Sequence, residues 1–453
     1  MSVARDRSPS ELGMSRVSVN RSSVGRVARI RGDAVGLLGL LVAGCVAIAA
    51  CSSGSVGVLP STTGRSVGRT TSTTMPTATE QSTIDVPPGY RTLSSHLSSA
   101  LDAYEAAVKR MPSTKQGDAS PVAAAELLPA NGNRLEALLA PGTLPSVDAW
   151  LDRFHAMGIR GVTVGIKLPM LLERFGPDAA SYTRFYTTVA DHARRRGMTV
   201  DVELGALFCG TAYASCTSPF NGSYRQFVDD TVAQARIVID RVRPRYLDIL
   251  AEPTTEATLT GVHEFKTPVG AARYVRDVLA GIGERRSTKV GAGGATWLDP
   301  IYDEAILREA VDFLVVHIYP MSSQIAGNIV DLTALARRAH KPIVADEIGL
   351  YKTDTAGAGA ATADSVYRLD AFSFFEPLDV RFLTITAEWA KKAAVAYVSP
   401  FWAGQFFAYI KWTPALDKEP FAALSRTSNA AIAKAFGADL LTRYGRTWPA
   451  ALR

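Results

Sequence analysis

The sequence predicts a (β/α)8 barrel from its length, from a repeated strand–helix pattern and from the number of repeats. Its 453 residues, 47% of them hydrophobic, are enough for one large barrel with appendages. From residue 119 to 453, short apolar runs typical of buried parallel strands alternate with segments of helical spacing. Eight units occur over about 320 residues, and eight is the number at which such a barrel closes.

The predicted strands are 122–131, 161–166, 198–205, 246–253, 289–294, 312–320, 342–349 and 395–402. A helix between the first two is expected to begin after an N-cap at Ser146, because apolar residues recur behind it at Val147, Leu151 and Phe154. Asn221 precedes a similar pattern. A doubly wound open sheet is the competing architecture, but no glycine-rich phosphate loop follows the first strand.

Residues 1–51 have the composition of a targeting segment. They hold seven arginines against three acidic residues and so account for four of the six net positive charges. The remainder shows no basic stripe, so nucleic acid is not an expected partner. The apolar run 34–51 is typical of a secretory signal, and its "VAGC" and "IAAC" endings resemble the lipobox of bacterial lipoproteins.

Cys51 is the expected lipidation site, because polar residues follow it, whereas cleavage before Cys45 would leave an apolar terminus. A plain transmembrane anchor is the alternative, since the apolar run is nearly long enough to span a bilayer. Either interpretation predicts an extracytoplasmic protein, and the lipoprotein interpretation anchors it to the outer face of the cell membrane.

Residues 52–88 are rich in Ser, Thr, Gly and Pro and predict a flexible tether, since they offer few large apolar side chains to bury. Residues 89–118 predict one helix before the barrel, with apolar positions at Leu97, Leu101, Tyr104 and Val108. The two cysteines beyond the targeting segment, Cys209 and Cys216, are expected to form a disulfide that closes a short loop.

Several polar and aromatic side chains lie at the ends of predicted strands, where the active site of a barrel is found. They are Glu203, Glu252, His317, Tyr319, Glu347 and Trp402. A lone strand-end carboxylate is usually a loop cap or an ion-pair partner, but several together favour a site. Two carboxylates on separate strands, with aromatic residues around them, are what cleavage of a glycosidic bond requires.

The same residues resemble clan A, the retaining glycoside hydrolases with (β/α)8 barrels. "LAEP" is similar to the clan's strand-four ending, which implies that Glu252 is the acid/base, and "PIVADEIG" is similar to its strand-seven ending, which implies that Glu347 is the nucleophile. "HIYP" and "PFW" supply the clan's aromatic residue beside the nucleophile, Tyr319, and its sugar-stacking tryptophan, Trp402. One departure is Ala251, where most of the clan has an asparagine that binds the sugar 2-hydroxyl.

Other residues have two interpretations. Glu256 is a rival acid four residues beyond Glu252, and Glu203 is either a site residue or the partner of an arginine. Asp346 is expected to point away from Glu347, because neighbouring residues of a strand face opposite sides. His317 shares a face with Tyr319, so it belongs either to the site or to the barrel core.

Two tryptophans complete the set. Trp297, after the fifth strand, either stacks on a sugar ring or packs within a loop, and Trp389, in a helical stretch, is expected in the core. The sequence contains no clustered metal ligands, phosphate loop or Ser-His-Asp pattern, so no cofactor or metal is expected.

The predicted function is cleavage of a glycosidic bond in a polysaccharide or oligosaccharide by a retaining mechanism with two glutamates. Two alternatives remain. One is an envelope transglycosylase that uses the same glutamates, and the other is a carbohydrate-binding lipoprotein without catalysis, for which Ala251 is the one hint. The sequence leaves the sugar, the linkage and the oligomeric state open.

Overall fold

The computed structural model describes residues 85–113, 120–209, 216, 220, 222–319, 322–353 and 363–453. The predicted targeting segment and the predicted tether as far as residue 84 lie outside these residues. Within the part of the chain that is described, no helix is long and apolar enough to cross a membrane.

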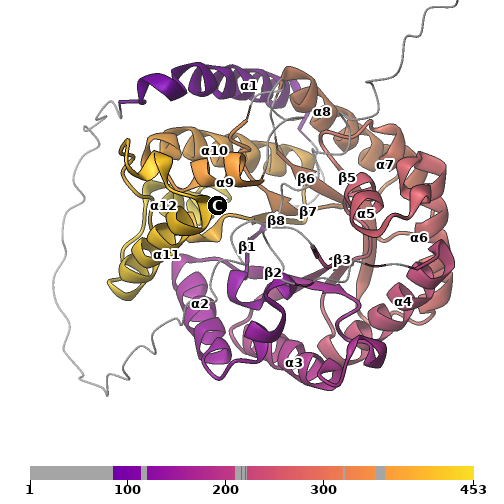
Figure 1. The fold of residues 1–453 in the computed structure, drawn as a ribbon. Coiled ribbons are helices and arrows are strands. Elements are labelled where there is room, and N and C mark those ends of the chain that lie inside the picture. The colour runs from indigo at the N-terminus through magenta and orange to yellow at the C-terminus, as the bar shows by residue number, and fades with distance from the viewer. Residues whose placement is uncertain are drawn as a thin grey trace, which may run out of the picture. The chain divides into compact units, whose positions relative to one another are not determined.

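Eight parallel strands close into a barrel in the order of the sequence, each paired with its neighbours and β8 paired with β1. Figure 1 looks into this barrel, with helices around the strands. The strands are β1 Val122–Glu126, β2 Gly161–Leu168, β3 Thr199–Ala206, β4 Tyr246–Asp248, β5 Lys289–Ala295, β6 Phe313–Ile318, β7 Ile343–Ile348 and β8 Tyr397–Pro400. The predicted (β/α)8 fold is confirmed, and the open sheet is excluded.

The α-helices are α1 Arg91–Arg110, α2 Thr143–Met157, α3 Ala179–Arg195, α4 Tyr224–Ile237, α5 Pro253–Thr260, α6 Pro268–Ile282, α7 Ile301–Ile306, α8 Ser323–Arg338, α9 Ala363–Asp370, α10 Glu376–Ala393, α11 Phe421–Gly437 and α12 Arg443–Ala451. Short 3-10 helices include η2 Leu128–Ala130 and η3 Gly132–Leu139, which follow β1. The helix predicted for 89–118 is confirmed as α1, which packs against α8 and α10 (Figure 1).

Two predicted strands end earlier than expected. The first ends at Glu126, because the chain then turns into η2, where Pro129 has no N–H to continue the sheet. The fourth is β4, whose hydrogen bonding to β5 continues only to Leu250, which accepts from the Gly293 N–H at 2.8 Å. Glu252 therefore lies beyond the strand, immediately before α5, and Pro253 begins that helix.

The predicted helix starts also need correction. α2 begins at Thr143 rather than after Ser146, and Pro145 fits in its first turn, where a missing N–H removes no helical hydrogen bond. The N-cap of α4 is Ser223, whose side chain accepts from the Gln226 N–H at 3.2 Å. Asn221 lies outside the described residues.

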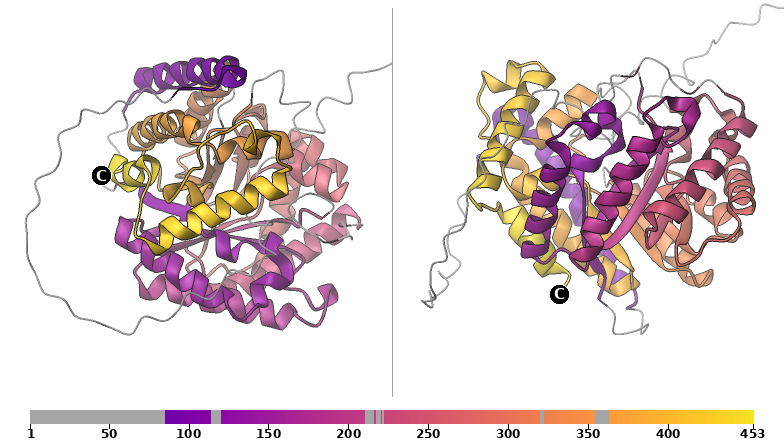
Figure 2. Two further views of the ribbon diagram at one scale, coloured as in Figure 1. Left: turned by 60° about the vertical axis from the view of Figure 1, so that its left-hand side comes forward. Right: turned by 90° about the horizontal axis from the view of Figure 1, so that it is seen from below.

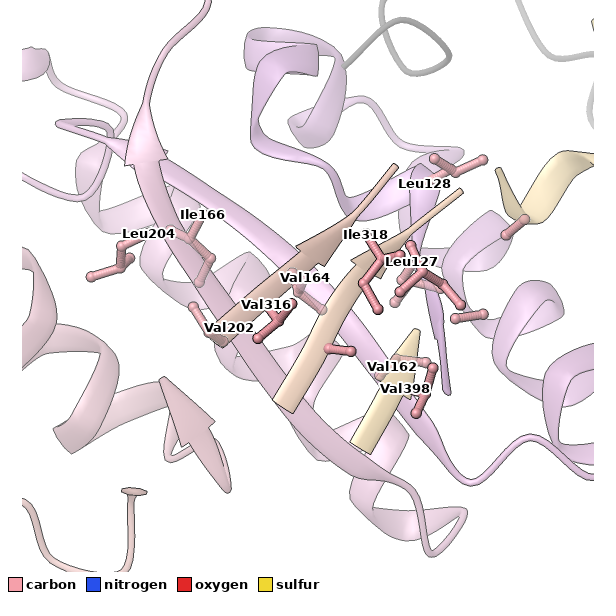
Figure 3. Close-up of a cluster of buried hydrophobic side chains, with 14 of the residues drawn as sticks. Leu127, Leu128, Val162, Val164, Ile166, Val202, Leu204, Val316, Ile318 and Val398 are labelled. Atoms are coloured by element: carbon pink, nitrogen blue, oxygen red, sulfur yellow. The ribbon is translucent and has the colours of Figure 1, made fainter. Parts of the chain in front are cut away.

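The strands separate two apolar regions. Outward-facing residues pack against the helices, and Figure 3 shows Val162, Val164, Ile166, Val202, Leu204, Val316, Ile318 and Val398 among them. A smaller cluster fills the barrel interior with Ala124, Ala251, Phe313, Val315, Val344 and Tyr397. Because side chains alternate along each strand, inward-facing positions further along the strands become polar, at Glu126, Lys167, Glu203 and His317.

Three further features lie outside the site. The predicted disulfide between Cys209 and Cys216 is confirmed. Trp389 is buried as expected, and its indole N–H donates to Thr333 Oγ1 at 3.0 Å. α11 and α12 lie on the outside of the barrel (Figure 2), and Trp448 of α12 donates to the Ala124 carbonyl at 2.7 Å.

Candidate active site

Glu252 and Glu347 lie close together at the carboxyl ends of the strands. Glu347 is the last but one residue of β7, and Glu252 follows β4 just before α5. A carboxylate oxygen of each, together with a ring nitrogen of His317, lies within 4.8 Å of the others. Both glutamates are buried, with 7% and 5% of Glu252 and Glu347 exposed. The barrel thus joins two acids that are 95 residues apart in the sequence.

His317 of β6 bridges the two glutamates. Its Nδ1 is 2.8 Å from Glu252 Oε1 and 3.4 Å from Glu347 Oε2. On the other side of the ring, Nε2 is 3.5 Å from Asp346 Oδ1, which is longer than an ordinary hydrogen bond. With 1% of its surface exposed, His317 belongs both to the barrel core and to the site, the two interpretations that the sequence left open.

Asp346 does not point away from Glu347, as strand alternation predicted, since both contact the His317 ring. The cause is a β-bulge in the pairing of β6 with β7. Val315 pairs with Val344, but His317, two residues further along β6, pairs with Glu347, three residues further along β7. The extra residue allows two successive side chains of β7 to face the barrel interior.

Hydroxyl groups hold both carboxylates. Tyr319, which follows β6, donates its hydroxyl to Glu347 Oε1, and Thr255 in the first turn of α5 donates to Glu252 Oε2. Tyr319 is 1% exposed, so water does not compete freely for its hydroxyl. Each glutamate therefore has one oxygen fixed by a neutral donor and the other near His317.

Burial raises the pKa of the Glu347 carboxyl well above its usual range, and the charges of Glu203 and Glu252 act in the same direction. The His317 imidazolium and the Tyr319 hydroxyl oppose this rise. Burial disfavours the imidazolium, but the carboxylates around it outweigh that penalty and hold the pKa of His317 well above its usual value. The site thus combines a protonated imidazole with carboxyl groups that compete for protons.

Aromatic rings line the site around Tyr319. The rings of Trp297 and Trp402 each lie 5.6 Å from it, and the ring of Tyr351 lies 5.8 Å from it. Trp402 is buried, and Gly349 has no room for a side chain because its Cβ would lie 1.6 Å from the indole. Trp297 is partly exposed, so of the two tryptophans it is the more accessible residue.

Glu203 pairs with a lysine rather than with an arginine. Lys167, near the end of β2, places its Nζ 2.9 Å from Glu203 Oε1. Burial raises the pKa of Glu203, but Lys167 and His317 outweigh burial and lower it below its usual range. Glu126, at the end of β1, accepts from Asn131 Nδ2 at 3.2 Å, and burial raises its pKa to about 8.

The rival acid, Glu256, lies in α5 and faces a different neighbour. Its Oε1 accepts from the backbone N–H of Ala206, at the end of β3, at 3.1 Å. Burial raises its pKa to about 7, although the hydrogen bond from Ala206 lowers it. Glu256 therefore caps a strand, whereas Glu252 faces Glu347 across His317.

Two groups of side chains in the described residues have the spacing of metal ligands, Glu252 with His317 and Glu347, and Asp248 with His317 and Asp346. Imidazole and carboxylate suit a divalent ion. In the first group, a hydroxyl group also donates to one oxygen of each carboxylate.

Sequence reasoning missed the residues that support the two glutamates. Thr255 is three residues after Glu252, the spacing at which a residue before a helix contacts its first turn, so a local signal existed. Lys167 is a charge within an apolar strand, just before Pro169, which also marks it. Asp248 is inward-facing on β4, and only the closed barrel brings it near His317.

A scan against protein-family models finds no match, and no curated protein matches the sequence. Solved structures are similar at low identity. GH5_18 from Bifidobacterium longum is 13% identical, with a TM-score of 0.48 over 73% of this chain and 78% of that chain. An exo-β-1,4-mannosidase from an Opitutaceae bacterium is 16% identical, with a TM-score of 0.45 over 69% of this chain and 60% of that chain.

A Thermotoga maritima protein solved with cellobiose is 14% identical, with a TM-score of 0.41 over 70% of this chain and 96% of that chain. Such values assign no function, so we argue the function from the residues of the site.

Proposed function

We propose that the protein is a glycoside hydrolase that cleaves a polysaccharide or oligosaccharide by the retaining mechanism. One observation carries the proposal: Glu252 and Glu347 approach to within 4.8 Å through one oxygen each. Retaining enzymes hold their two carboxyl groups about 5–5.5 Å apart, whereas inverting enzymes need about 6.5–9.5 Å for a water molecule. The nearest oxygens of the two carboxylates thus lie closer than the inverting separation, which supports direct attack by one carboxylate.

In the first step, Glu347 attacks the anomeric carbon and the bond from that carbon to the leaving oxygen breaks. Glu252 gives its proton to the leaving oxygen. Tyr319 donates to the Glu347 carboxylate and so supports its ionised form against burial. We assign Glu347 as the nucleophile because it lies within β7, whereas Glu252 lies beyond the end of β4.

In the second step, Glu252 takes a proton from water, the water oxygen bonds to the anomeric carbon, and the ester bond to Glu347 breaks. His317 contacts both glutamates, so it orients the pair through both steps and supplies positive charge between them. The partly exposed ring of Trp297 offers a surface on which a sugar can stack.

The test uses 2,4-dinitrophenyl glycosides of glucose, galactose, mannose and xylose in both anomeric forms, together with polysaccharides. Glu347→Gln should abolish turnover on every accepted substrate, because no covalent intermediate can form. Glu252→Gln should keep activity on the dinitrophenyl glycosides, whose leaving groups need little protonation, and azide should accelerate it by attacking the intermediate.

Glu256→Gln is the control for the acid/base role, since that acid lies in α5 but contacts the backbone of β3. It should show neither the acceleration by azide nor the dependence on the leaving group that Glu252→Gln shows. Wild-type rates for Glu347→Gln, or the Glu252 phenotype in Glu256→Gln, would contradict the assignment. No turnover by the wild type on any substrate would favour the binding-protein alternative. Disaccharide products from the aryl glycosides would favour the transglycosylase.

We also propose that the chain is an extracytoplasmic lipoprotein anchored through Cys51. The small residues before Cys51 and the polar residues after it support this. In a bacterial host that processes lipoproteins, Cys51→Ser should release the protein from the membrane fraction, whereas Cys45→Ser should not. Membrane retention of Cys51→Ser at full length would indicate a transmembrane anchor instead.

A further inference from the structure

A buried ion pair lies beside the catalytic glutamates on neighbouring strands. In the pairing of β2 with β3, Gly165 lies opposite Glu203, and Lys167 lies opposite Gly205. The two charged side chains therefore reach toward each other across positions that carry no side chain, and Lys167 Nζ lies 2.9 Å from Glu203 Oε1. The charge of Glu203 also raises the pKa of Glu347, the proposed nucleophile.

This pair has hydrogen-bonding capacity that the described residues do not use. An ammonium group has three N–H donors, and Lys167 donates only to Glu203 among the described residues. Glu203 Oε2 has no hydrogen-bond partner among the same residues. The Lys167 side chain is 3% exposed, so unused donors are costly there and favour a bound hydroxyl group or water.

Glu203 is also the most open acid of the group. Its side chain is 17% exposed, against 8% for Glu252, 7% for Glu347 and 1% for Asp346. Lys167 keeps the Glu203 carboxyl ionised by lowering its pKa, so Glu203 is an acceptor of hydrogen bonds and not a proton donor. A partly exposed acceptor beside a buried donor can bind a polar ligand.

Glycines leave room at the pair. A Cβ at Gly205 would lie 3.1 Å from Glu256 Oε1, 3.5 Å from Lys167 Nζ and 3.6 Å from Glu203 Oε1. A Cβ at Gly165 would lie 3.3 Å from Lys167 Cε. A side chain at either position would meet the head groups, so the glycines allow Lys167 and Glu203 to meet above their own strands.

We propose that Lys167 and Glu203 bind two adjacent hydroxyl groups of the sugar at the scissile bond, Glu203 as acceptor and Lys167 as donor. This inference rests on the proposed glycosidase function. The charged pair would make hydroxyl contacts that Ala251 cannot make, because its side chain is only a methyl group. The substrate is then a sugar with free neighbouring hydroxyl groups at this subsite.

The test asks whether the effect of each substitution depends on the presence of one sugar hydroxyl group. Lys167→Met and Glu203→Gln are compared with the wild type on an accepted dinitrophenyl glycoside and on its 2-deoxy and 3-deoxy analogues. Loss of a hydroxyl contact costs about 10- to 100-fold in kcat/KM. We expect losses of this size on the parent substrate, and losses below about threefold on the analogue that lacks the matching hydroxyl.

Arg174→Met is the matched control, because it breaks an ion pair with Asp230 that is formed by α4 and a 3-10 helix. It should leave kcat/KM unchanged on all substrates. Equal losses on parent and deoxy substrates would show that Lys167 and Glu203 only stabilise the barrel, and an absence of loss would also overturn the inference. Neither result would change the expected effects of Glu252→Gln and Glu347→Gln, so this inference can be wrong while the proposed glycosidase function stands.

Discussion

Replacing Tyr319 by Phe should weaken catalysis in a pH-dependent way. The hydroxyl of Tyr319 donates to Glu347 Oε1, and the residue is 1% exposed, so no water readily replaces the donor. A hydrogen bond to a charged group contributes about 1.5–3 kcal/mol. At about 1.4 kcal/mol for each factor of ten, kcat/KM should fall by about 10- to 100-fold at neutral pH.

The direction of the pH effect follows from the same bond. Tyr319 lowers the pKa of Glu347 against the rise caused by burial, so phenylalanine leaves that pKa higher than in the wild type. The carboxylate required as nucleophile is then present only at higher pH. The acidic limb of the kcat/KM profile should move up by about one to two pH units, and the activity loss should shrink as pH rises.

The assay is kcat/KM on an accepted dinitrophenyl glycoside over the whole pH range in which the protein stays folded, so that the acidic limb of both proteins is measured. Tyr104→Phe is the control, since its hydroxyl contacts Thr386 Oγ1 at 3.2 Å within the packing of α1 against α10. It should leave the profile unchanged. A loss in Tyr319→Phe that is equal at every pH, or no loss, would refute a role in ionising Glu347.

Further predictions concern stability and metals. Asp303 is fully buried, and burial raises its pKa to about 8. The folded protein therefore holds this proton more tightly than the unfolded chain, so the free energy of unfolding is highest below about pH 4 and falls as pH rises toward 8. The free energy of unfolding of Asp303→Asn, measured with urea, should therefore exceed that of the wild type by up to about 5 kcal/mol at pH 8.5 and by almost nothing at pH 4. An equal difference at both pH values would contradict this. Replacing Cys209 and Cys216 by serine should cost about 2 kcal/mol in the same assay, because the disulfide closes a short loop, and an unchanged unfolding midpoint would exclude that contribution. Dialysis against EDTA should leave kcat unchanged, whereas a loss that zinc restores would identify a metal at His317.

The sequence was sufficient to predict the barrel and the meeting of its two acids. Each strand is a short apolar run, and parallel strands end on one face, so Glu252 and Glu347 could be placed among the residues of one site, and the resemblance to clan A distinguished them from the others. The end of β4 was harder to predict, because the apolar residues 249–251 continue past Asp248 and hydrogen bonding, not composition, decides where the sheet stops. The strand ends at Asp248, and Glu252 reaches the site from the start of a helix.

The direction of Asp346 could not be predicted, because the β-bulge against β6 depends on pairing between two strands and leaves no local signal in either. The contacts of Lys167 and Glu203 depend on pairing in the same way, since strand register brings the two together. Burial is the other quantity that periodicity does not supply. Trp402 was expected to form the floor of a sugar site, and it lies 3% exposed against Tyr319 and Gly349.

The central claim is that Glu347 becomes covalently bonded to the sugar during turnover. The most direct measurement is mass spectrometry of the protein after incubation with 2,4-dinitrophenyl 2-deoxy-2-fluoro glycosides, which form the intermediate but hydrolyse it slowly. We predict one sugar per chain on an accepted glycoside, on the peptide that contains Glu347, and no label in Glu347→Gln. A label on Glu252 or Glu256, or turnover of the parent glycoside with no label on any residue, would contradict the account.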